Sequence, residues 1–546
     1  MNRSVHLQVA LESGECREMQ VASEDRTLAD ELAAQGLALN TRCGRRGLCR
    51  GCEVNLEEGT LKLGEQTASA PSVVKACCAH VSGDARIHIP ARSRIEHRPQ
   101  VGDTFEVAVP FGDDPLFPAT ADGRDTAFAV DVGTTTVVVL LVDVNTGETL
   151  ARAGGFNEQI RFGDNVLTRI EAARQAENLM AMQRAMVMET LQPLLLRACE
   201  RAGRAPERIA GGAIAGNTTM LHLLTGEDPT PLGIAPFTPR FIAARRLTAR
   251  DIDLTVDGLA ADTPLQLLPG IAAYIGADIT AGILASGMVF DARPSLLVDI
   301  GTNGEIVLQS GGELTACATA AGPAFEGCGL RCGTRAREGA VSGLRLGLSP
   351  FCLEADVIGG IEATAANGIC GSAYIDFLAN GRRSGLLASN GRFVAAVWDA
   401  IPAGHRLSED GERALLLSDG GGTAKLCVSE VDVALLMQAK AAIGAGIEIL
   451  LKTAGISASD LGCVYLAGGF GMHLHVGNAI AMGLLPGIRE DQVRVMGNTS
   501  LAGAMLSLLD RGLLGEMEEL RQRTKVIELN LAEDFEDHYI DHLSLP

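Results

Sequence analysis

The sequence predicts an α+β domain at the N-terminus, followed by a larger α/β region that is built from two related halves. Closely spaced cysteines and glycines dominate residues 42–54 in the first region. In the second region, a strand, an Asp-x-Gly-Thr turn and another strand follow one another twice, at residues 128–144 and 296–308. A chain of 546 residues with 47% hydrophobic side chains can form several domains with buried cores. We therefore expect a domain at residues 1–92, a linker at 93–125, and the two halves at 126–290 and 291–546.

Four cysteines of the N-terminal region have a spacing that suits a [2Fe-2S] cluster. Cys43, Cys49 and Cys52 lie in one loop, and Cys77 follows near the end of the domain. Five residues separate the first two cysteines, whereas the plant-type pattern has four, so the loop is longer but keeps its ligands. Glycines lie between these cysteines, and they favour a cluster because a loop around it needs positive φ angles and backbone amides close to sulfur.

Two alternatives remain for these thiols. Structural zinc could also use four cysteines, but zinc ribbons present two close CxxC pairs, and only Cys49 and Cys52 form one here. The cluster is therefore the preferred interpretation. The fourth ligand is assigned to Cys77 because the Gly-Asp pair and apolar strand that follow it look like the closing stretch of [2Fe-2S] ferredoxins. The adjacent Cys78 is the alternative ligand.

Composition predicts the cellular location and excludes two classes of partner. Fourteen cysteines without an N-terminal signal peptide argue for a reducing compartment, and we expect a cytoplasmic protein. No apolar run is long enough to span a bilayer, so we expect no membrane association. The formal net charge of -21 disfavours nucleic acid as a partner. A stretch dense in proline, glycine and charge, from about Ala91 to Asp125, is typical of a linker.

The two repeated turns predict a site for phosphate groups. They align on Asp131 with Asp299 and on Gly133 with Gly301. Each turn offers backbone amides and hydroxyls to phosphates, and each aspartate can position a hydrated magnesium ion. Two related α/β halves that close on one ligand would bring both turns together. A P-loop ATPase is not the interpretation, because no GxxxxGKS/T sequence occurs at these turns.

A third element, residues 463–471, is a buried strand that ends in Gly468, Gly469 and Gly471. Glycines at this point would let a planar base approach the backbone. In this order, the three segments resemble the phosphate-1, phosphate-2 and adenosine motifs of the superfamily that contains acetate kinase, sugar kinases, Hsp70 and actin. The resemblance implies an actin-like ATPase with two duplicated halves.

Together with the cysteine-rich domain, these motifs make the whole chain resemble the reductive activators of corrinoid proteins. These are ATP-dependent enzymes that return inactive Co(II) corrinoid to Co(I) for methyl transfer. Four further segments match that family's pattern, namely AGNTTM at 215–220, TAAGPAFEG at 319–327, RCGTRA at 331–336 and GNAIAMGLLPG at 477–487. The resemblance covers nearly the full length. It implies a ferredoxin-like (β-grasp) N-terminal domain of the α+β class, followed by the α/β actin-like ATPase, and it suggests a homodimer.

The resemblance also implies roles for individual residues. The four cysteine ligands would hold a cluster that accepts one electron from a low-potential donor and passes it to cobalt in a corrinoid protein. The three glycines after the third strand would receive the adenosine of ATP. Contacts to phosphate or to Mg²⁺ would come from both turns, through Asp131, Gly133, Thr134, Thr135, Asp299, Gly301, Thr302 and Asn303.

Other residues receive roles from their local context. Glu326 follows a Gly-Pro turn after the second phosphate loop and is a candidate for orienting the attacking water; a surface or helix-capping glutamate is the alternative. Ser429 and Asp432 form a capping-box-like start and predict a packing helix that extends to Thr453. His475 is interpreted as structural. Aromatic content of 4% leaves little basis for a stacking platform, so we expect the corrinoid on the partner.

Two other classes of function are compatible with these features. One is an electron carrier whose actin-like part gates delivery to a noncorrinoid acceptor. The other is a chaperone-like ATPase with a structural metal domain, although fewer than about 80 residues follow Gly471, which is short for an independent substrate-binding domain. Reduction of a corrinoid protein, but not of other acceptors, would distinguish the corrinoid activator from the first alternative.

Overall fold

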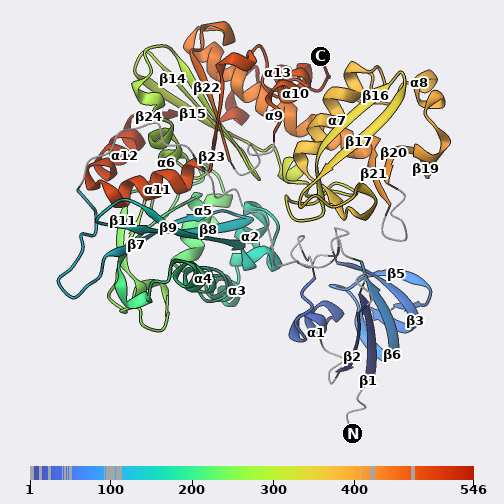
Figure 1. Ribbon diagram of the computed structural model, residues 1–546, viewed down its shortest axis with the longest axis horizontal. Coiled ribbons are helices and arrows are strands. Elements are labelled where there is room, and N and C mark those ends of the chain that lie inside the picture. Colours follow the sequence, from blue (N-terminus) through green and yellow to red (C-terminus); the bar gives the residue numbers. More distant parts are fainter. Residues whose placement is uncertain are drawn as a thin grey trace.

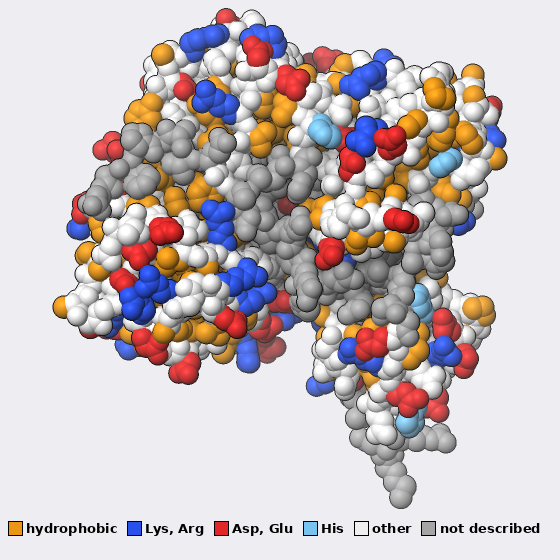
Figure 2. Space-filling view, in the orientation of Figure 1, with side chains coloured by type: hydrophobic (Ala, Val, Ile, Leu, Met, Phe, Trp, Pro, Cys, Tyr) orange, Lys and Arg blue, Asp and Glu red, His pale blue; other side chains and the backbone are white. Residues whose placement is uncertain are grey.

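The computed structural model describes residues 5–11, 15–21, 26–39, 41, 45, 47, 52–64, 66–90, 93, 105, 114–409, 411–418, 425–468 and 474–546. Figure 1 shows a small lobe at the N-terminal end of the chain, drawn in blue, and a larger body. The small lobe projects from the body in the space-filling view (Figure 2). Acidic and basic side chains are interspersed on the visible faces of both parts, so neither visible face carries one charge sign.

The N-terminal lobe is a six-stranded mixed sheet packed against one helix. Its elements are β1 Val5–Leu11, β2 Cys16–Val21, α1 Leu28–Ala34, β3 Glu53–Leu63, β4 Gln66–Ser69, β5 Ser72–Lys75 and β6 His80–Ile89. The strand order is β2-β1-β6-β3-β4, with β5 also paired to β3. The first and last strands, β1 and β6, pair in parallel at the centre, and their other neighbours run antiparallel. Leu28 and Leu32 of α1 are fully buried in one cluster with Val9 and Ile87 of the sheet, and this contact fixes the helix on the sheet.

The body contains two six-stranded sheets that share five strands of the same topology, with the sixth strand, β11 or β24, at opposite edges. The first comprises β7 Thr126–Val132, β8 Thr136–Asp143, β9 Thr149–Phe156, β10 Ile209–Gly216, β11 Arg245–Thr248 and β12 Pro264–Leu267. The second comprises β13 Ser295–Ile300, β14 Gly304–Ser310, β15 Glu313–Thr319, β22 Cys463–Ala467, β23 Val493–Gly497 and β24 Thr524–Val526. The orders are β11-β12-β10-β7-β8-β9 and β23-β22-β13-β14-β15-β24. Each has an antiparallel meander whose first strand pairs in parallel with a later strand, so the repeat predicted from the sequence is a repeat of structure.

Burial on both faces accounts for the apolar sequence of the central strands. β7 and β8 are buried along almost their whole length, so their side chains form a continuous apolar run instead of alternating with polar ones. Strands covered on both faces have this pattern. The helices of this half are α2 Val166–Ala173, α3 Ala176–Arg184, α4 Gln192–Ala202, α5 Thr218–Leu224 and α6 Ala277–Ser286. A π-helical segment, Ala185–Leu191, joins α3 to α4.

Two helices, α6 from the first half and α11 (Thr499–Leu509) from the second, pack closely together. A Cβ atom at Gly503 of α11 would lie 2.6 Å from Ala281 Cα, and one at Gly282 of α6 would lie 2.9 Å from Thr499 Oγ1. Only glycine permits this approach, because real Cβ atoms do not come so close to other atoms. The close approach sets the start of α11 against the end of β7, where the first polar site residue lies.

A further lobe is inserted into the second half between β15 and the long helix α9 (Glu430–Ala454). It contains β16 Ala340–Leu348, β17 Phe351–Val357, β18 Gly368–Ile369, α7 Gly371–Arg383, α8 Ala395–Ala400, β19 Arg406–Glu409, β20 Glu412–Ser418 and β21 Leu426–Ser429. The predicted capping box at the start of α9 is confirmed, since Ser429 and Asp432 each accept a hydrogen bond from the other's backbone amide. Among the described residues, α9 alone has the length and hydropathy to cross a membrane, but 78% of that stretch is buried, as in a core helix. After α9 come α10 Val476–Ala481, α12 Arg511–Arg523 and α13 Phe535–Asp541.

The last part of the predicted linker packs against the body. The backbone amide of Leu116 donates to the carbonyl of Leu508 at 2.8 Å. Phe117 is 4% exposed and belongs to the core of the first half, where its ring lies above Gly211. A Cβ atom at Gly211 would lie 2.4 Å from that ring, so the glycine makes room for the phenylalanine. Residues 114–125 are therefore attached to the body, while residues 94–104 and 106–113 lie outside the described residues.

Candidate active site

A cavity of about 130 Å³ lies between the two halves, where β7 and β13 end. The two predicted turns contribute Asp131, Gly133, Thr134, Thr135, Asp299, Gly301, Thr302 and Asn303. The predicted Glu326 and Gly468 also line it. The sequence analysis did not identify the remaining lining residues, which are Thr136, Asn217, Asp278, Glu305, Asn498, Thr499 and Ser500. The structure thus brings together all the predicted nucleotide-site residues that it describes, whereas Gly469 and Gly471 lie outside the described residues.

The first turn is held from beneath by buried side chains. The amide of Gly133 donates to the carbonyl of Thr136 at 2.9 Å, which closes the turn. Asn157 donates to the carbonyl of Gly133 at 2.9 Å. Arg169 is fully buried and donates to the carbonyls of Gly163 and Thr134. These contacts occupy the inner backbone groups of the turn and leave its hydroxyls facing the cavity.

Asp131 is bound by side chains of the other half. Asn498, which caps α11, donates to its carboxylate at 2.8 Å, and Ser500 donates at 2.7 Å. Burial raises the pKa of Asp131, and these two hydrogen bonds oppose that rise because they stabilise the ionised form. The aspartate therefore links β7 to α11 across the cleft.

Asp299, its counterpart in the second turn, has different surroundings. The turn itself is similar, since the amide of Gly301 donates to the carbonyl of Asn303 at 2.9 Å. No hydrogen bond from another described residue reaches the Asp299 carboxylate. Burial, and then the nearby charge of Asp131, raise its pKa to about 7. This group keeps both oxygens available for a ligand.

Two further acids complete the floor of the cavity. Burial, followed by the charges of Asp299 and Asp131, raises the pKa of Asp278 to about 8. Glu305 is 8% exposed, and burial next to Asp278 and Asp299 raises its pKa well above the usual range. Carboxylates so arranged favour a divalent cation, because the cation removes their mutual repulsion. Among the described residues, no three histidines, cysteines or acids are arranged to hold a metal directly.

Glu326 connects the hydroxyls of the two turns. Thr135 Oγ1 donates to its Oε2 at 3.0 Å, and Thr302 Oγ1 donates to its Oε1 at 3.1 Å. The two hydroxyl oxygens lie 3.4 Å apart. Arg335, from the RCGTRA segment, donates through Nη2 to Thr135 Oγ1 at 3.0 Å. The glutamate is therefore a cavity residue, and not the surface or capping glutamate of the alternative interpretation.

Gly468 lies beside the second turn for a steric reason. Its φ is +96°, and a Cβ atom there would lie 2.5 Å from the carbonyl oxygen of Ile300 and 2.8 Å from Asp299 Oδ1. The glycine therefore lets the end of β22 approach the end of β13. The predicted approach of a planar base to Gly468 stays a prediction.

His475, predicted to be structural, lies within hydrogen-bond distance of a buried acid of the inserted lobe. Its Nδ1 lies 3.0 Å from both carboxylate oxygens of Asp376, and Asn478 donates to the same carboxylate at 2.7 Å. Asp376 is 1% exposed. These contacts join the start of α10, which follows the third glycine-rich segment, to α7.

The N-terminal lobe brings two of the predicted cysteine ligands together. Cys52 is fully buried and Cys77 is 4% exposed. The hydrogen bond between their thiols lowers the pKa of Cys52 to about 6 and raises the pKa of Cys77. Cys78 Sγ lies 3.6 Å from Cys77 Sγ, and a Cβ atom at Gly47 would lie 2.7 Å from it. Cys77 therefore faces Cys52, while Cys78 faces the cysteine loop at Gly47; Cys43 and Cys49 lie outside the described residues.

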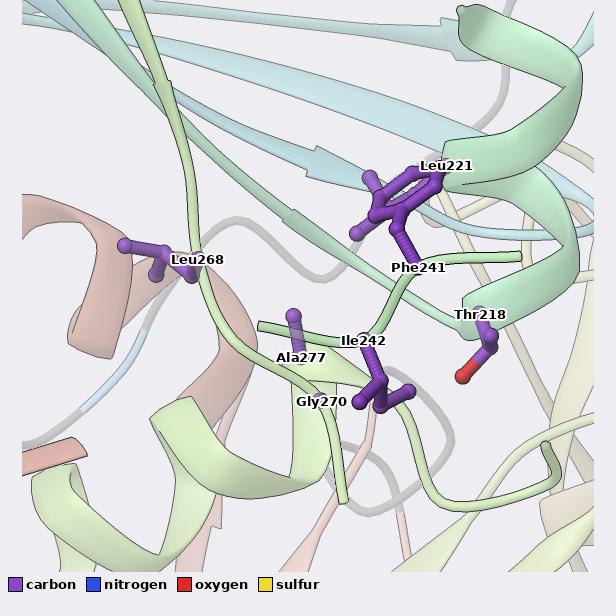
Figure 3. A pocket seen from close by; sticks show the side chains of 7 residues that line it. All are labelled: Thr218, Leu221, Phe241, Ile242, Leu268, Gly270 and Ala277. Carbon is purple, nitrogen blue, oxygen red and sulfur yellow. The ribbon is translucent and has the colours of Figure 1, made fainter. Parts of the chain in front are cut away.

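A second, smaller cavity lies beside α5 (Figure 3). Mainly apolar side chains line it, including Leu221, Phe241, Ile242 and Leu268. Its volume of about 10 Å³ leaves room for one water at most, so it is no candidate for a nucleotide.

Sequence reasoning missed the residues that reach the cavity from outside the two turns. Asp278 lies at the start of α6, and Asn498 and Ser500 lie at the start of α11. Signals did exist for two others. Asn217 lies in AGNTTM and donates to Thr134 Oγ1 at 2.9 Å, and Arg335 lies in RCGTRA, so both belong to segments that the family pattern had marked.

Two family models match this chain. The one described as the RACo middle region matches residues 126–291. The one described as the C-terminal domain of RACo, the ASKHA domain, matches residues 293–546. Together they cover more than half of the chain.

The similarity to individual relatives also includes the N-terminal lobe. The corrinoid activation enzyme RamQ of Eubacterium limosum is 30% identical over 592 residues, which cover 95% of this chain and 96% of RamQ. The Co(II) methylated amine-specific corrinoid protein reductase of Methanosarcina barkeri is 26% identical over 444 residues, or 76% of each chain. Among solved structures, a reductive activator for corrinoid, iron-sulfur protein matches with a TM-score of 0.71 and 27% identity, covering 99% of this chain and 98% of that one.

Proposed function

We infer the function of this chain from the family to which it belongs, the reductive activators of corrinoid proteins (RACo). The chain is an ATP-dependent reductase that converts the cobalt of a corrinoid protein from Co(II) to Co(I), the form that takes part in methyl transfer. One observation carries this conclusion: the similarity to a corrinoid activation enzyme extends over 95% of the chain and includes the cavity lined by both phosphate turns. The same similarity favours corrinoid cobalt over a noncorrinoid acceptor, and an activator over a chaperone-like ATPase.

The cavity between the halves is the proposed ATP site. The hydroxyls of Thr134, Thr135 and Thr302 face it from both turns, and backbone amides of the turns add further donors for phosphate oxygens. Asp131 and Asp299 would position hydrated Mg²⁺, whose charge would relieve the repulsion among the buried acids. The adenosine is assigned to the segment of Gly468, Gly469 and Gly471, of which Gly468 lines the cavity.

Glu326 is the proposed residue for orienting the attacking water. Its carboxylate lies within hydrogen-bond distance of the hydroxyls of Thr135 and Thr302, and so between the two phosphate turns. A carboxylate at that point can accept a proton from a water that attacks the terminal phosphate.

The N-terminal lobe is proposed to be a ferredoxin-like (β-grasp) domain at residues 1–92 that holds a [2Fe-2S] cluster. Its mixed sheet, with parallel first and last strands and one helix, supports the fold. The buried and adjacent thiols of Cys52 and Cys77 fit a cluster site, with Cys43 and Cys49 as the remaining ligands and Cys78 as the alternative to Cys77. When bound, the cluster supplies a one-electron carrier. The polypeptide around these thiols shields them from solvent.

The rest of the domain division is also proposed, with a linker at 93–125 and the two ATPase halves at 126–290 and 291–546. The ranges of the two family models, 126–291 and 293–546, support it. The electron would come from a low-potential donor, and the corrinoid would belong to the partner protein. We further propose a cytoplasmic location, which the cysteine content favours, and a homodimeric assembly, which the family resemblance implies.

ATP is needed because the reduction is uphill. We expect the Co(II)/Co(I) couple to lie below the potential of an ordinary ferredoxin-type cluster, and each deficit of about 59 mV for one electron costs about 1.4 kcal/mol. A nucleotide can drive such a step only if it binds two conformations with different affinity. A site shared between two halves supplies this difference, since closing or opening the halves changes the contacts to phosphate.

The test of this function is made with protein purified without air. Iron and sulfide analysis and the EPR spectrum identify the cluster, and the Co(I) absorption band is then followed after a Co(II) corrinoid protein and a chemical reductant are added. The expected result is a [2Fe-2S] signal and Co(I) formation that requires ATP. A cluster with no corrinoid reduction would point to another acceptor, and zinc in place of iron would overturn the redox role.

A comparison of two serine variants tests which cysteine is the fourth ligand of the cluster. Cys77→Ser should lower the iron content and abolish the cluster spectrum, because Cys77 lies beside the buried Cys52. Cys78→Ser should retain the spectrum. The opposite pattern would transfer the assignment to Cys78, which faces the cysteine loop at Gly47.

A further inference from the structure

The cavity has many acids but no basic side chain of its own. Among the described residues that line it, Asp131, Asp278, Asp299, Glu305 and Glu326 carry carboxylates, and none is Lys or Arg. A triphosphate adds further negative charge, which the buried setting makes costly unless cations approach it. Magnesium would supply one cation. A second cation must come from a basic residue that contacts the residues lining the cavity.

Arg335 is placed to be that residue. It donates through Nη2 to Thr135 Oγ1 at 3.0 Å, and its Nε lies 3.8 Å from Oε2 of Glu326. Its guanidinium carbon lies 5.3 Å from the ring centroid of Phe156, at the end of β9. Arg335 comes from the second half, whereas Thr135 and Phe156 belong to the first. The side chain therefore bridges the cleft next to the hydroxyls assigned to phosphate.

Two glycines fix Arg335 beside Glu326. A Cβ atom at Gly327 would lie 2.3 Å from the carbonyl oxygen of Thr334, and one at Gly333 would lie 2.0 Å from the carbonyl oxygen of Gly327. The segments that follow Glu326 and precede Arg335 are therefore in direct backbone contact. The amide of Thr334 also donates to the carbonyl of Ile369 at 2.9 Å. The position of Arg335 is thus set by packed backbone and does not depend on its side-chain contacts.

The guanidinium of Arg335 retains an unused donor. Its Nε is buried and has no hydrogen-bond partner among the described residues, since the distance to Glu326 is too long. Arg169, a fully buried arginine at the first turn, differs in this respect because it donates to Gly163 O, Thr134 O and Gln159 Oε1. Arg169 supports the loop, while Arg335 has capacity left for an anion. Buried donors of this kind are seldom left without a ligand.

We propose that Arg335 binds the terminal phosphate of ATP and thereby makes the contact between the two halves depend on that phosphate. This inference rests on the proposed ATP site. A phosphate that accepts hydrogen bonds from Thr135 and Thr302 takes the place that the Glu326 carboxylate holds between them. Arg335 then exchanges a carboxylate for a phosphate as its anion, and Glu326 is released towards water. ADP lacks the terminal phosphate and does not cause the exchange.

The experiment measures the affinities of ATP and ADP, each with Mg²⁺, by calorimetry on the full-length protein with its cluster. Arg335→Met should weaken ATP binding at least about tenfold and change ADP binding less than about twofold, because only ATP reaches the guanidinium. Arg335→Lys should fall between Arg335→Met and the wild type, since lysine keeps the charge but lacks the planar fork. Arg345→Met is the control. Arg345 lies on β16 with its side chain 60% exposed and is paired with Glu354 and Asp356, away from the cavity lining.

The outcomes separate this inference from the proposed function. If the wild type binds neither nucleotide, the proposed ATP site itself is wrong. If the wild type binds ATP and Arg335→Met binds it with unchanged affinity, the site stands and the role of Arg335 is overturned. Equal losses of ATP and ADP affinity would also overturn it, because they would mean that Arg335 maintains the cavity as a whole. ADP affinity close to that of the wild type also shows that the variant is folded.

Discussion

The two phosphate turns share a sequence pattern but differ in what surrounds their aspartates. Asn498 and Ser500 of the second half bind the carboxylate of Asp131 at 2.8 and 2.7 Å. No hydrogen bond from another described residue reaches Asp299, and burial with the nearby charge of Asp131 raises its pKa to about 7. One aspartate thus joins the two halves, while the other keeps its carboxylate oxygens available for a cation.

The difference arises from the helices that follow corresponding strands. α11 follows β23 and carries neutral donors to Asp131, whereas α6 follows β12 and carries Asp278, an acid whose pKa is raised by burial and then by the charge of Asp299. Duplication has preserved the backbone of the turns, but the helix that faces each turn has different polar residues. A repeated motif therefore predicts where a ligand lies, and the neighbouring helices decide what each copy does.

The largest effect is expected from Asp299→Asn. The substitution removes the charge available to Mg²⁺ and keeps the shape, so the rate of ATP hydrolysis should fall about a hundredfold or more. Phosphate release with excess Mg²⁺ measures the rate. Asp257→Asn is the matched control, because Asp257 is exposed in the first half. Hydrolysis within twofold of the wild type in Asp299→Asn would remove Asp299 from the site.

The same variant should be more stable than the wild type when no nucleotide is added. The unfolded chain titrates Asp299 near 3.8 and the folded protein near 7, so the folded state binds the additional proton between these values and loses stability as the pH rises through them. Asparagine has no charge to bury. The free energy of unfolding should therefore rise by about 1–3 kcal/mol at pH 8 and change little at pH 4. Urea unfolding at both pH values measures it, and a loss of stability at pH 8 would contradict the assignment.

Ser500→Ala tests the contact between the halves. It leaves the buried carboxylate of Asp131 without one of its two donors, and the free energy of unfolding should fall by about 1–2 kcal/mol. Ser507→Ala, on the same helix, is the control because the Ser507 hydroxyl donates only to the carbonyl of Ala504. Equal effects of the two substitutions would show that the bond to Asp131 adds nothing beyond an ordinary helix contact.

The smallest effect is expected at the hydroxyls of the turns. Thr135 contacts Glu326, Thr302 and Arg335, whereas Thr302 contacts Glu326 and Thr135. Thr135→Val should therefore raise the KM for ATP about fivefold, and Thr302→Val about twofold. Steady-state hydrolysis gives both values. A larger effect at Thr302 would reverse the order of importance of the two turns.

The sequence predicted the parts of the site that lie in continuous motifs. The spacing of Asp131 and Gly133, repeated at Asp299 and Gly301, indicated both turns, and the structure places them on one cavity. The duplicated halves followed from the same repeat. These features are local, because the backbone conformation of a strand and the tight glycine turn after it depends on residues that are neighbours in the sequence.

The rest of the site depends on contacts between distant segments. Asn498 and Ser500 reach Asp131 only because glycines let α11 approach α6 closely. Arg335, which donates to Thr135, is held beside Glu326 because Gly327 and Gly333 let the loop 327–334 fold back on itself. No periodicity or spacing in a single sequence indicates such pairings. The steric demand for glycine at position 468 was not predictable either, because the neighbour concerned is the carbonyl of Ile300, more than a hundred residues away.

The most direct test of the account compares Co(I) formation and phosphate release in the same anaerobic sample. Wild type and Asp299→Asn are matched for iron content and mixed with a Co(II) corrinoid protein, reductant, Mg²⁺ and ATP. We predict that the variant keeps the EPR signal of the cluster and loses Co(I) formation and phosphate release together. Co(I) formation at the wild-type rate in a variant that no longer hydrolyses ATP would contradict it, since the cavity between the halves would then not drive the reduction.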